Sequence, residues 1–313
     1  MHMTVDRSIT IGSMFSGMGG LDLAVQQITG ATPAWFCEWD DAPAKVLAHH
    51  HPDVTNFRDV TQIDWATIPP VDIITGGYPC QPFSRAGQQK GTDDERHLWP
   101  HILTAIRALR PRFAFLENVA DHLGRGFDTV LADLAKIGWD ARWATLRASD
   151  VGAPHHRDRL FILAYPGGER PQAERFARGS AEAITWHHDG EQAFPRLGGG
   201  ADIGDVWNDL RSQWGDHAAA IFQWEILTRP LPLVVEEQVS FRDEELWGRA
   251  FPEVKPAMSP EFVEWMIGLP AGHVTGVPGV SRAQQLKMLG NGVVPQQAAY
   301  ALKLMIGESD EDH

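Results

Sequence analysis

The sequence contains little cysteine and no long apolar run. Only two cysteines occur in 313 residues, which is too few for a disulfide framework or a zinc-binding spacing. An intracellular, reducing environment is therefore the simplest interpretation. No stretch is long enough to cross a membrane, and the N-terminal residues lack the apolar run of a signal peptide. We expect a soluble, cytoplasmic protein with no membrane partner.

Basic residues are scarce relative to acidic ones. The chain has 27 Lys and Arg against 41 Asp and Glu, which gives a formal net charge of −14. Proteins that bind nucleic acid usually carry a basic surface, so this balance argues against such a partner unless the positive charge is clustered. Part of the acidic excess lies in the run GESDEDH at residues 307–313, which we interpret as a solvated tail.

The first half of the chain shows a regular alternation of strand-like and helix-like segments. Short apolar runs that end in loop residues predict strands within residues 8–16, 34–40, 71–79, 112–119 and 159–166. Helical spacing predicts helices within residues 20–28, 42–51, 98–109 and 127–138. This alternation is typical of an α/β fold with a doubly wound, mostly parallel sheet.

The character of the sequence changes after residue 166. Residues 167–256 are rich in Gly and polar side chains with weak periodicity, so we expect a small, loop-rich second domain there. Helical signals return with Ser259 as an N-cap and Pro260 in the first turn, and a tight turn precedes a final helix within residues 289–307. We expect residues 257–313 to return to the larger domain formed by residues 1–166.

The stretch FSGMGGLDLA, residues 15–24, follows the first predicted strand. Its glycines let the backbone turn tightly and let a ligand approach, although the spacing differs from the dinucleotide pattern G-x-G-x-x-G. About twenty residues later, Glu38 could accept hydrogen bonds from ribose hydroxyls and Trp39 could cover an adenine face. A plain tight turn and an exposed acidic loop are the alternatives. Together the two features favour an adenosine-type cofactor, whereas Cys37 is expected to pack in the core.

The stretch GGYPCQPFSRAG, residues 76–87, holds the other cysteine, Cys80, directly after a predicted strand. Open α/β sheets place their sites at this edge. A catalytic cysteine acts as the thiolate and needs cationic or helix-end groups nearby to lower its pKa. The alternative, a buried and inert cysteine, fits poorly because the flanking Gly, Pro and Ser are loop residues.

Two further polar clusters flank predicted strands. Glu117 and Asn118 end an apolar strand, where a carboxyl in a partly apolar site would have a raised pKa; a capping Asn with a solvated Glu is the alternative. Arg157 and Arg159 precede another strand and, in extended backbone, would face the same side, where they could hold a carbonyl oxygen or a phosphate. The two adjacent histidines before them lack a third ligand, so no metal site is expected.

Taken together and in this order, these motifs resemble those of the DNA (cytosine-5) methyltransferases of bacteria and phages. The corresponding stretches are FSGMGG, EWD, RDV, GGYPCQPFS, ENV, HHRDR and LGNGVVP. The resemblance runs almost from end to end of the chain. It implies a Rossmann-like fold that binds S-adenosylmethionine, with residues 167–256 as the target recognition domain.

The resemblance implies a role for each catalytic position. Cys80 would be the nucleophile that attacks carbon 6 of cytosine, and Glu117 would protonate N3. Arg159 would contact O2 of cytosine, with Arg157 beside it. His155 stands where the family usually has Gln, at a position that mainly supports the turn.

The resemblance also implies two binding surfaces. The cofactor would be bound by residues of five motifs: Phe15, Gly17, Gly19, Gly20, Leu21, Glu38, Trp39, Asp59, Val60, Pro79, Asn291 and Gly292. Duplex DNA would be bound by the nucleophile loop, which must close over the base, through Gln81, Ser84, Arg85, Lys90 and Arg96. We further expect a DNA-facing stripe of arginines that comprises Arg85, Arg96, Arg142, Arg147, Arg157 and Arg159.

The implied reaction is methylation of carbon 5 of cytosine in a short duplex sequence, with the target base flipped out of the helix. Three alternatives are a tRNA cytosine-5 methyltransferase, an inactive DNA-binding scaffold and a Rossmann dehydrogenase. The glycine spacing and the prolyl-cysteine loop argue against the dehydrogenase. No endonuclease motif is present, so a partner restriction endonuclease would be a separate chain. We expect the protein to act as a monomer.

Overall fold

The computed structural model describes residues 8–79, 98–169, 211–229, 231–232, 234–243 and 250–307. The chain divides into two compact units. Unit 1 comprises Met1–Val151, His155–Thr185 and Gly292–His313, and unit 2 comprises Gly152–Pro154 and Trp186–Asn291. Every described residue expected in the site lies in unit 1, apart from Asn291.

Unit 1 is built on a seven-stranded sheet with the order β3-β2-β1-β4-β5-β7-β6. Its strands are β1 (Thr10–Met14), β2 (Thr32–Cys37), β3 (Thr55–Asn56), β4 (Ile73–Gly77), β5 (Phe113–Val119), β6 (Trp139–Leu146) and β7 (Arg159–Pro166). Strands β1 to β5 run parallel to their neighbours in this group, whereas β7 is antiparallel to both β5 and β6. The prediction of a doubly wound, mostly parallel sheet is confirmed.

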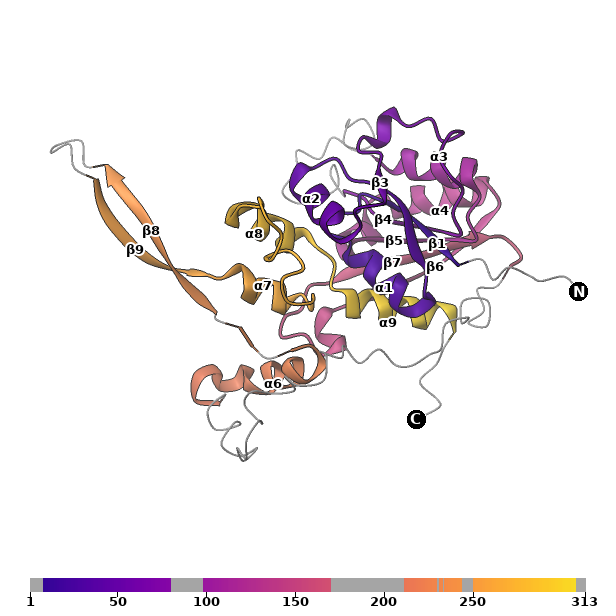
Figure 1. Cartoon of the computed structure of the whole chain (residues 1–313). Coiled ribbons are helices and arrows are strands. Elements are labelled where there is room, and N and C mark those ends of the chain that lie inside the picture. Colours follow the sequence, from indigo (N-terminus) through magenta and orange to yellow (C-terminus); the bar gives the residue numbers. More distant parts are fainter. Residues whose placement is uncertain are drawn as a thin grey trace, which may run out of the picture. The chain divides into compact units, whose positions relative to one another are not determined.

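Helices follow the strands and cover the sheet (Figure 1). They are α1 (Gly20–Thr29), α2 (Asp41–His50), α3 (Trp99–Leu109), α4 (Phe127–Lys136) and α9 (Pro295–Ile306). Because β1 lies between β2 and β4, the strand order reverses there. Open α/β sheets bind their ligands at the carboxyl ends of the strands beside such a reversal, so the loops after β1, β2 and β4 are the expected site.

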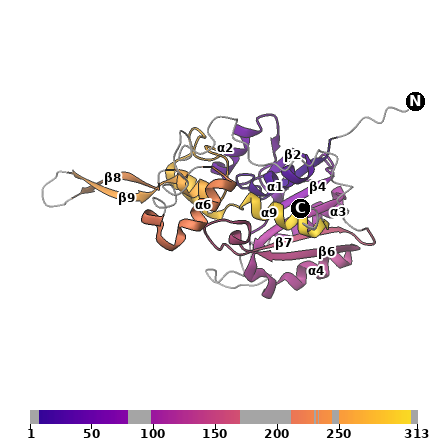
Figure 2. The same cartoon turned by 90° about the horizontal axis from the view of Figure 1, so that it is seen from below.

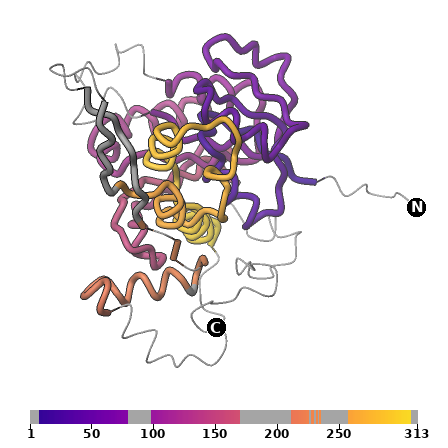
Figure 3. Tube along the Cα trace, turned by 60° about the vertical axis from the view of Figure 1, so that its left-hand side comes forward, coloured from indigo at the N-terminus to yellow at the C-terminus, as the bar shows by residue number. Residues whose placement is uncertain are grey.

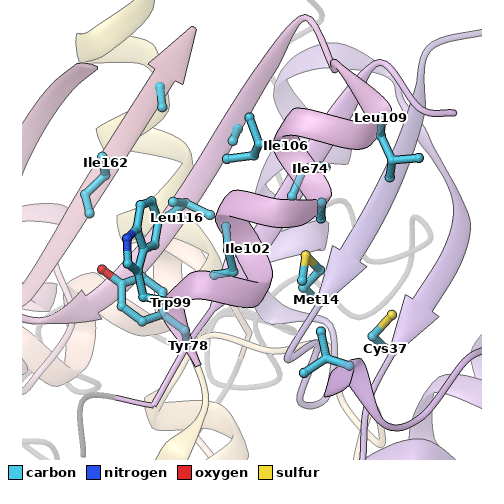
Figure 4. Close-up of a cluster of buried hydrophobic side chains, with 14 of the residues drawn as sticks. Met14, Cys37, Ile74, Tyr78, Trp99, Ile102, Ile106, Leu109, Leu116 and Ile162 are labelled. Atoms are coloured by element: carbon cyan, nitrogen blue, oxygen red, sulfur yellow. The ribbon is translucent and has the colours of Figure 1, made fainter. Parts of the chain in front are cut away.

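Apolar side chains form a separate cluster on each face of the sheet. On one face, α3 and α4 cover a cluster that includes Met14, Ile74 and Leu116 (Figure 4). On the other face, α1 and α9 cover a cluster that includes Ile11 and Phe115. Figure 2 shows α9 lying across the strands of this second face. Burial on both faces explains why the central strands read as continuous apolar runs.

Helix α9 completes unit 1 from a distant part of the sequence. Figure 3 shows it in yellow near the end of the described trace. The buried side chain of Gln297 in α9 donates hydrogen bonds from Nε2 to the carbonyls of Leu146, at 2.8 Å, and Arg157, at 3.0 Å. One amide group therefore holds the end of β6 and the residues before β7.

The described part of unit 2 contains α6 (Ala218–Leu227), the antiparallel strands β8 (Val235–Asp243) and β9 (Ala250–Met258), α7 (Pro260–Met266) and α8 (Arg282–Asn291). The hydroxyl of Ser259 accepts a hydrogen bond from the main-chain N–H of Phe262 at 3.1 Å, and Pro260 lies in the first turn of α7. The predicted N-cap is therefore confirmed.

A buried carboxylate organises the loop after α7. Glu264 accepts hydrogen bonds from the main-chain N–H groups of Gly272, at 2.8 Å, Val274, at 2.7 Å, and Thr275, at 3.0 Å. Arg229 forms an ion pair with the same carboxylate at 3.4 Å. These donors compensate the cost of burying the charge.

The structure differs from the sequence predictions in β6, α6, α8 and the β8–β9 hairpin, none of which was expected. Within the segment 167–256, the described residues form α6, β8 and most of β9. Strand β6 is an edge strand, and charged residues interrupt its apolar ones. Helix α8 buries few apolar side chains and so has weak periodicity. In the described part of the chain, no helix is long and apolar enough to span a membrane.

Candidate active site

Glu117 lies in β5 beside the last residue of β4. The strand register pairs it with Gly77, and a Cβ at that glycine would lie 3.3 Å from Oε2 of Glu117, which is a tight contact. Oε1 of Glu117 forms an ion pair with Nε of Arg159 at 2.7 Å, and both side chains are largely buried. Burial raises the pKa of Glu117, against the opposing charges of Arg159 and Arg157. A carboxyl with a raised pKa can hold a proton and donate it to a bound base.

Arg157 joins the segment before β7 to the turn before α9. Its φ of 42° is uncommon for a residue with a side chain, so the extended backbone expected between Arg157 and Arg159 is not present. The Arg157 guanidinium donates from Nη2 to the main-chain carbonyl of Gly292. Burial lowers the pKa of Arg157 to about 10, and the charge of Arg159 acts in the same direction. Arg159 thus contacts the carboxyl of Glu117, and Arg157 supports the turn at Gly292.

Glu38 follows β2, and its side chain turns back toward the loop between β1 and α1, residues 15–19, which we call the glycine loop. Its carboxylate accepts hydrogen bonds from the main-chain N–H of Gly17, at 2.7 Å, and of Asp40, at 2.8 Å. The side chain of Asn56, at the end of β3, exchanges hydrogen bonds with the main chain of Glu38 at 2.9 and 3.2 Å. Burial raises the pKa of Glu38, and the two amide donors oppose this effect. The carboxylate is therefore fixed in place with lone pairs left for a ligand hydroxyl.

Two residues expected to contact an adenine are at least partly exposed. The Trp39 side chain is 70% exposed, which leaves its ring available to a ligand. Asp59 accepts hydrogen bonds from the N–H and the hydroxyl of Thr61, and these bonds lower its pKa. Val60, by contrast, is buried, and its side chain packs in the core next to Asp59 in the sequence.

The loop between β1 and α1 has the strained backbone that its glycines predict. Phe15 has φ 52°, and its N–H donates to the carbonyl of Cys37 at 2.9 Å. Gly19 has φ 84° and forms the N-cap of α1. A Cβ at Gly20 would lie 2.8 Å from the carbonyl oxygen of Val293, so the glycine loop touches the turn before α9. Leu21 packs in the core, which leaves only its main chain to face a ligand.

A buried carboxyl lies at the start of α1. Asp22 accepts hydrogen bonds from the hydroxyl of Ser13 in β1, at 2.7 Å, and of Thr75 in β4, at 2.5 Å. Burial raises the pKa of Asp22 to about 6, and the two hydroxyl donors oppose the shift. This side chain joins the two strands at the point where the sheet order reverses.

The nucleophile loop begins at the limit of the described residues. Pro79 is exposed and is the last residue described before it. The predicted nucleophile Cys80 and the predicted DNA contacts Gln81, Ser84, Arg85, Lys90 and Arg96 lie outside the described residues. The other cysteine, Cys37, is buried in the core as predicted, and burial raises its pKa to about 12.

Three arginines of the predicted DNA-facing stripe have partners within the protein. Arg142 donates from Nη1 to the main-chain carbonyl of Met305 in α9, at 2.7 Å, and the half-buried Arg157 donates to that of Gly292. Arg147 is exposed, and it forms an ion pair with Asp158 at 3.2 Å.

Several residues of the site were missed by sequence reasoning. Asn56, Asp22 and Gln297 hold the loops in place, but each is an ordinary polar residue within or next to a predicted element. Only the observation that a polar side chain interrupts an apolar helix face, as Gln297 does among Ala298, Ala301 and its neighbours, could have indicated one of them.

The geometry can be compared with known proteins. A sequence model of the family "C-5 cytosine-specific DNA methylase" matches residues 9–220, which is more than half of the chain. The chain belongs to this family.

Individual relatives of this methylase family support the assignment. The Type II methyltransferase M1.ScrFI of Lactococcus lactis subsp. cremoris is 34% identical over 157 residues, which cover 49% of this chain and 40% of that protein. The Type II methyltransferase M.CviJI of Paramecium bursaria Chlorella virus IL3A is 31% identical over 179 residues, which cover 56% and 48%. The matched part thus spans about half the length of these relatives, or less.

Solved structures show the same fold over nearly the whole chain. The Dnmt2 methyltransferase of S. pombe has a TM-score of 0.62 at 15% identity and covers 96% of this chain and 99% of its own. A putative DNA modification methyltransferase encoded within an E. coli prophage has a TM-score of 0.56 at 20% identity, with coverage of 95% and 98%. These similarities confirm the Rossmann-like methyltransferase fold.

Proposed function

We propose that this methylase-family protein transfers a methyl group from S-adenosylmethionine to carbon 5 of cytosine in a short duplex DNA sequence. The observation that carries the proposal is the buried ion pair of Glu117 with Arg159, next to Gly77 at the end of β4. The family's chemistry needs a proton donor and a cationic contact directly beside the start of the Cys80 loop. The proposal includes action as a monomer, with any restriction endonuclease on a separate chain.

The residues after β1, β2 and β3 fit S-adenosylmethionine. The Glu38 carboxylate is held by the N–H groups of Gly17 and Asp40 and faces the glycine loop, as a ribose contact would. Trp39 offers an exposed ring for the adenine, and Asp59 a partly exposed carboxylate for its amine. When bound, the cofactor supplies an electrophilic methyl group.

The chain's own residues supply the activation of the base. The thiolate of Cys80 forms a bond to carbon 6, and the electron pair of the ring double bond moves to carbon 5. Glu117 gives its proton to N3, so no negative charge builds up on the ring. After carbon 5 carries the methyl group it loses its proton to water, the carbon–sulfur bond breaks, and the N3 proton returns to Glu117.

Arg159 is oriented before any base binds. Its Nε faces Glu117, and its Nη1 donates to the carbonyl of Asp158 at 2.9 Å. Two bonds fix the plane of the guanidinium, whose rigid fork suits a carbonyl oxygen such as O2 of cytosine. The ion pair also fixes the position of Glu117, the proton donor, relative to Arg159, the O2 contact.

The test measures transfer of labelled methyl groups to mixed-sequence duplex DNA and, in parallel, to tRNA. We expect methylation of DNA at one short motif, located by bisulfite sequencing, and its loss in Cys80→Ala. Transfer to tRNA alone would replace the DNA assignment by an RNA one. No transfer to either by a folded protein that binds S-adenosylmethionine would indicate an inactive scaffold.

A further inference from the structure

Tyr78 joins β4 to the nucleophile loop, and it is held at both its main chain and its side chain. Its carbonyl accepts a hydrogen bond from Nδ2 of Asn118 at 3.1 Å. Its ring is only 5% exposed and packs 5.8 Å from the ring of Trp99, between centroids (Figure 4). For packing alone a phenylalanine of the same shape would serve, so the hydroxyl group needs a separate explanation.

The hydroxyl of Tyr78 lies 2.8 Å from Nε2 of His122 in η3 (Ala120–Gly124), and the imidazole is only 3% exposed. The other ring nitrogen, Nδ1, lies 3.0 Å from the carbonyl of Arg125. A carbonyl can only accept, so Nδ1 carries a proton, and in the neutral form of the ring Nε2 is the acceptor. In that form the hydroxyl of Tyr78 donates to Nε2 of His122.

We propose that Tyr78 and His122 form a positioning pair for the nucleophile. The pair fixes the direction in which the chain leaves β4 toward Pro79 and Cys80. This inference rests on the proposed function and assigns to it two residues that do not touch the base or the cofactor.

The pair acts through the segment that carries the proton donor. Asn118 and His122 both follow Glu117 in the same stretch of chain, and both bind Tyr78. These two bonds therefore fix the residue before the Cys80 loop relative to Glu117, the carboxyl that must protonate the same base. A misplacement of a reacting group by about 1 Å can cost about 100-fold in rate, so a hydroxyl that removes this freedom has a catalytic effect.

The first experiment compares Tyr78→Phe with the wild type in single-turnover methyl transfer to DNA. The matched control is Thr29→Val at the far end of α1, which also removes a buried hydroxyl. That hydroxyl donates to the carbonyl of Val25 at 2.7 Å and accepts from the N–H of Ala31 at 3.2 Å. We expect Tyr78→Phe to lower the rate constant about tenfold, with the Kd for S-adenosylhomocysteine unchanged. Thr29→Val should lose similar thermal stability with no change in rate.

Two substitutions of His122 test the acceptor. Gln places an amide oxygen near the position of Nε2 and should retain most of the rate, whereas Leu should lose as much as Tyr78→Phe. Combined with Tyr78→Phe, His122→Leu should add little, because both changes remove the same interaction. Additive losses would contradict a pair.

A second readout does not depend on methylation. Cys37 is buried with a raised pKa, so alkylation of the native protein by iodoacetamide reports Cys80. We expect the alkylation rate of Tyr78→Phe to differ from wild type by about threefold or more, and that of Thr29→Val to match wild type. If the wild type methylates nothing, the proposed function fails, but the alkylation rates still test whether Tyr78 and His122 position Cys80. Unchanged alkylation together with an unchanged transfer rate would overturn the pair.

Discussion

Single carboxyl groups set much of the chemistry of this site. Glu117, Glu38 and Asp22 are all buried in unit 1, and burial raises the pKa of each. Their partners differ: arginines face Glu117, main-chain amides face Glu38, and hydroxyls face Asp22. Glu117 is therefore suited to proton transfer, Glu38 to binding a ligand, and Asp22 to joining strands.

Replacement of Glu117 by Gln tests the proton donor. The amide keeps the shape of the side chain but cannot give a proton to N3, so the single-turnover rate should fall by about 100-fold or more. The wild-type rate should also fall as the pH rises through the raised pKa of Glu117, because the acid form is lost. Gln should abolish that limb of the pH–rate profile.

The exposed Glu169 offers a control, because Glu169→Gln makes the same chemical change away from the site. It should leave both the rate and the pH profile as in wild type. A Glu117→Gln protein with the wild-type rate would remove Glu117 from the mechanism.

Replacement of Asp22 by Asn should change how stability depends on pH. The folded-state pKa of about 6 is above the ordinary value of 3.8, so the protonated form stabilises the fold fully below about pH 4. That contribution is lost as the pH rises through 6. Asn stays neutral, so its unfolding free energy should rise relative to wild type between pH 4 and 8, by at most about 3 kcal/mol.

Urea unfolding at several pH values measures this difference. Asp128→Asn is the matched control, because Asp128 also lies in the first turn of a helix but is exposed. Parallel stability curves for wild type and Asp22→Asn would show that Asp22 is not the titrating group.

Individual residues were predictable where their position at a strand end marked them. Glu38 and Glu117 each follow or end an apolar strand, so sequence alone placed them at the sheet edge. The contact of Tyr78 with His122 was not predictable, because it joins residues 44 positions apart and depends on how β4 and β5 align. Long-range pairing of this kind follows from packing and leaves no local pattern.

At the scale of elements, the glycine loop and the turn before α9 meet at one close contact. Gly20→Ala would push a methyl group against the carbonyl of Val293, at 2.8 Å before relaxation. We expect a loss of about 1–3 kcal/mol in unfolding free energy and weaker binding of S-adenosylhomocysteine. Calorimetric titration and thermal unfolding measure both.

The control for this change is Gly124→Ala in η3, where a Cβ would meet nothing within 4 Å. That variant should bind S-adenosylhomocysteine as wild type does. Equal binding by Gly20→Ala would mean that the loop does not depend on its contact with Val293.

Elements with a strong apolar period were predicted, and those without one were not. Strands β1, β4 and β5 and helices α1 and α3 carry apolar residues on buried surfaces and end at Gly or polar residues. Strand β6 is an edge strand, and helix α8 buries only Met288 and Leu289, so neither has the pattern of a buried element. Their positions follow from the tertiary structure around them.

At the scale of the whole molecule, the two units should respond differently to ligand. S-adenosylhomocysteine at about 100 times its Kd should stabilise the unit that binds it by about 3 kcal/mol. Hydrogen exchange should therefore slow in peptides of α1 and α9, which lie in unit 1, and stay unchanged in α7, which lies in unit 2. Equal slowing in both would show that they open as one cooperative body.

Helix α9 has a consequence for biosynthesis. Its apolar residues cover α1 and the sheet, but about 140 residues separate the end of β7 from the end of α9. At about 5–20 residues per second, a ribosome needs roughly 7–28 s to make that stretch. During this time α1 alone covers that face of the sheet, and the turn that supports the cofactor loop does not yet exist. Unit 1 can therefore mature only after unit 2 has been translated, and until then this partly covered face is the part of the chain most in need of a chaperone.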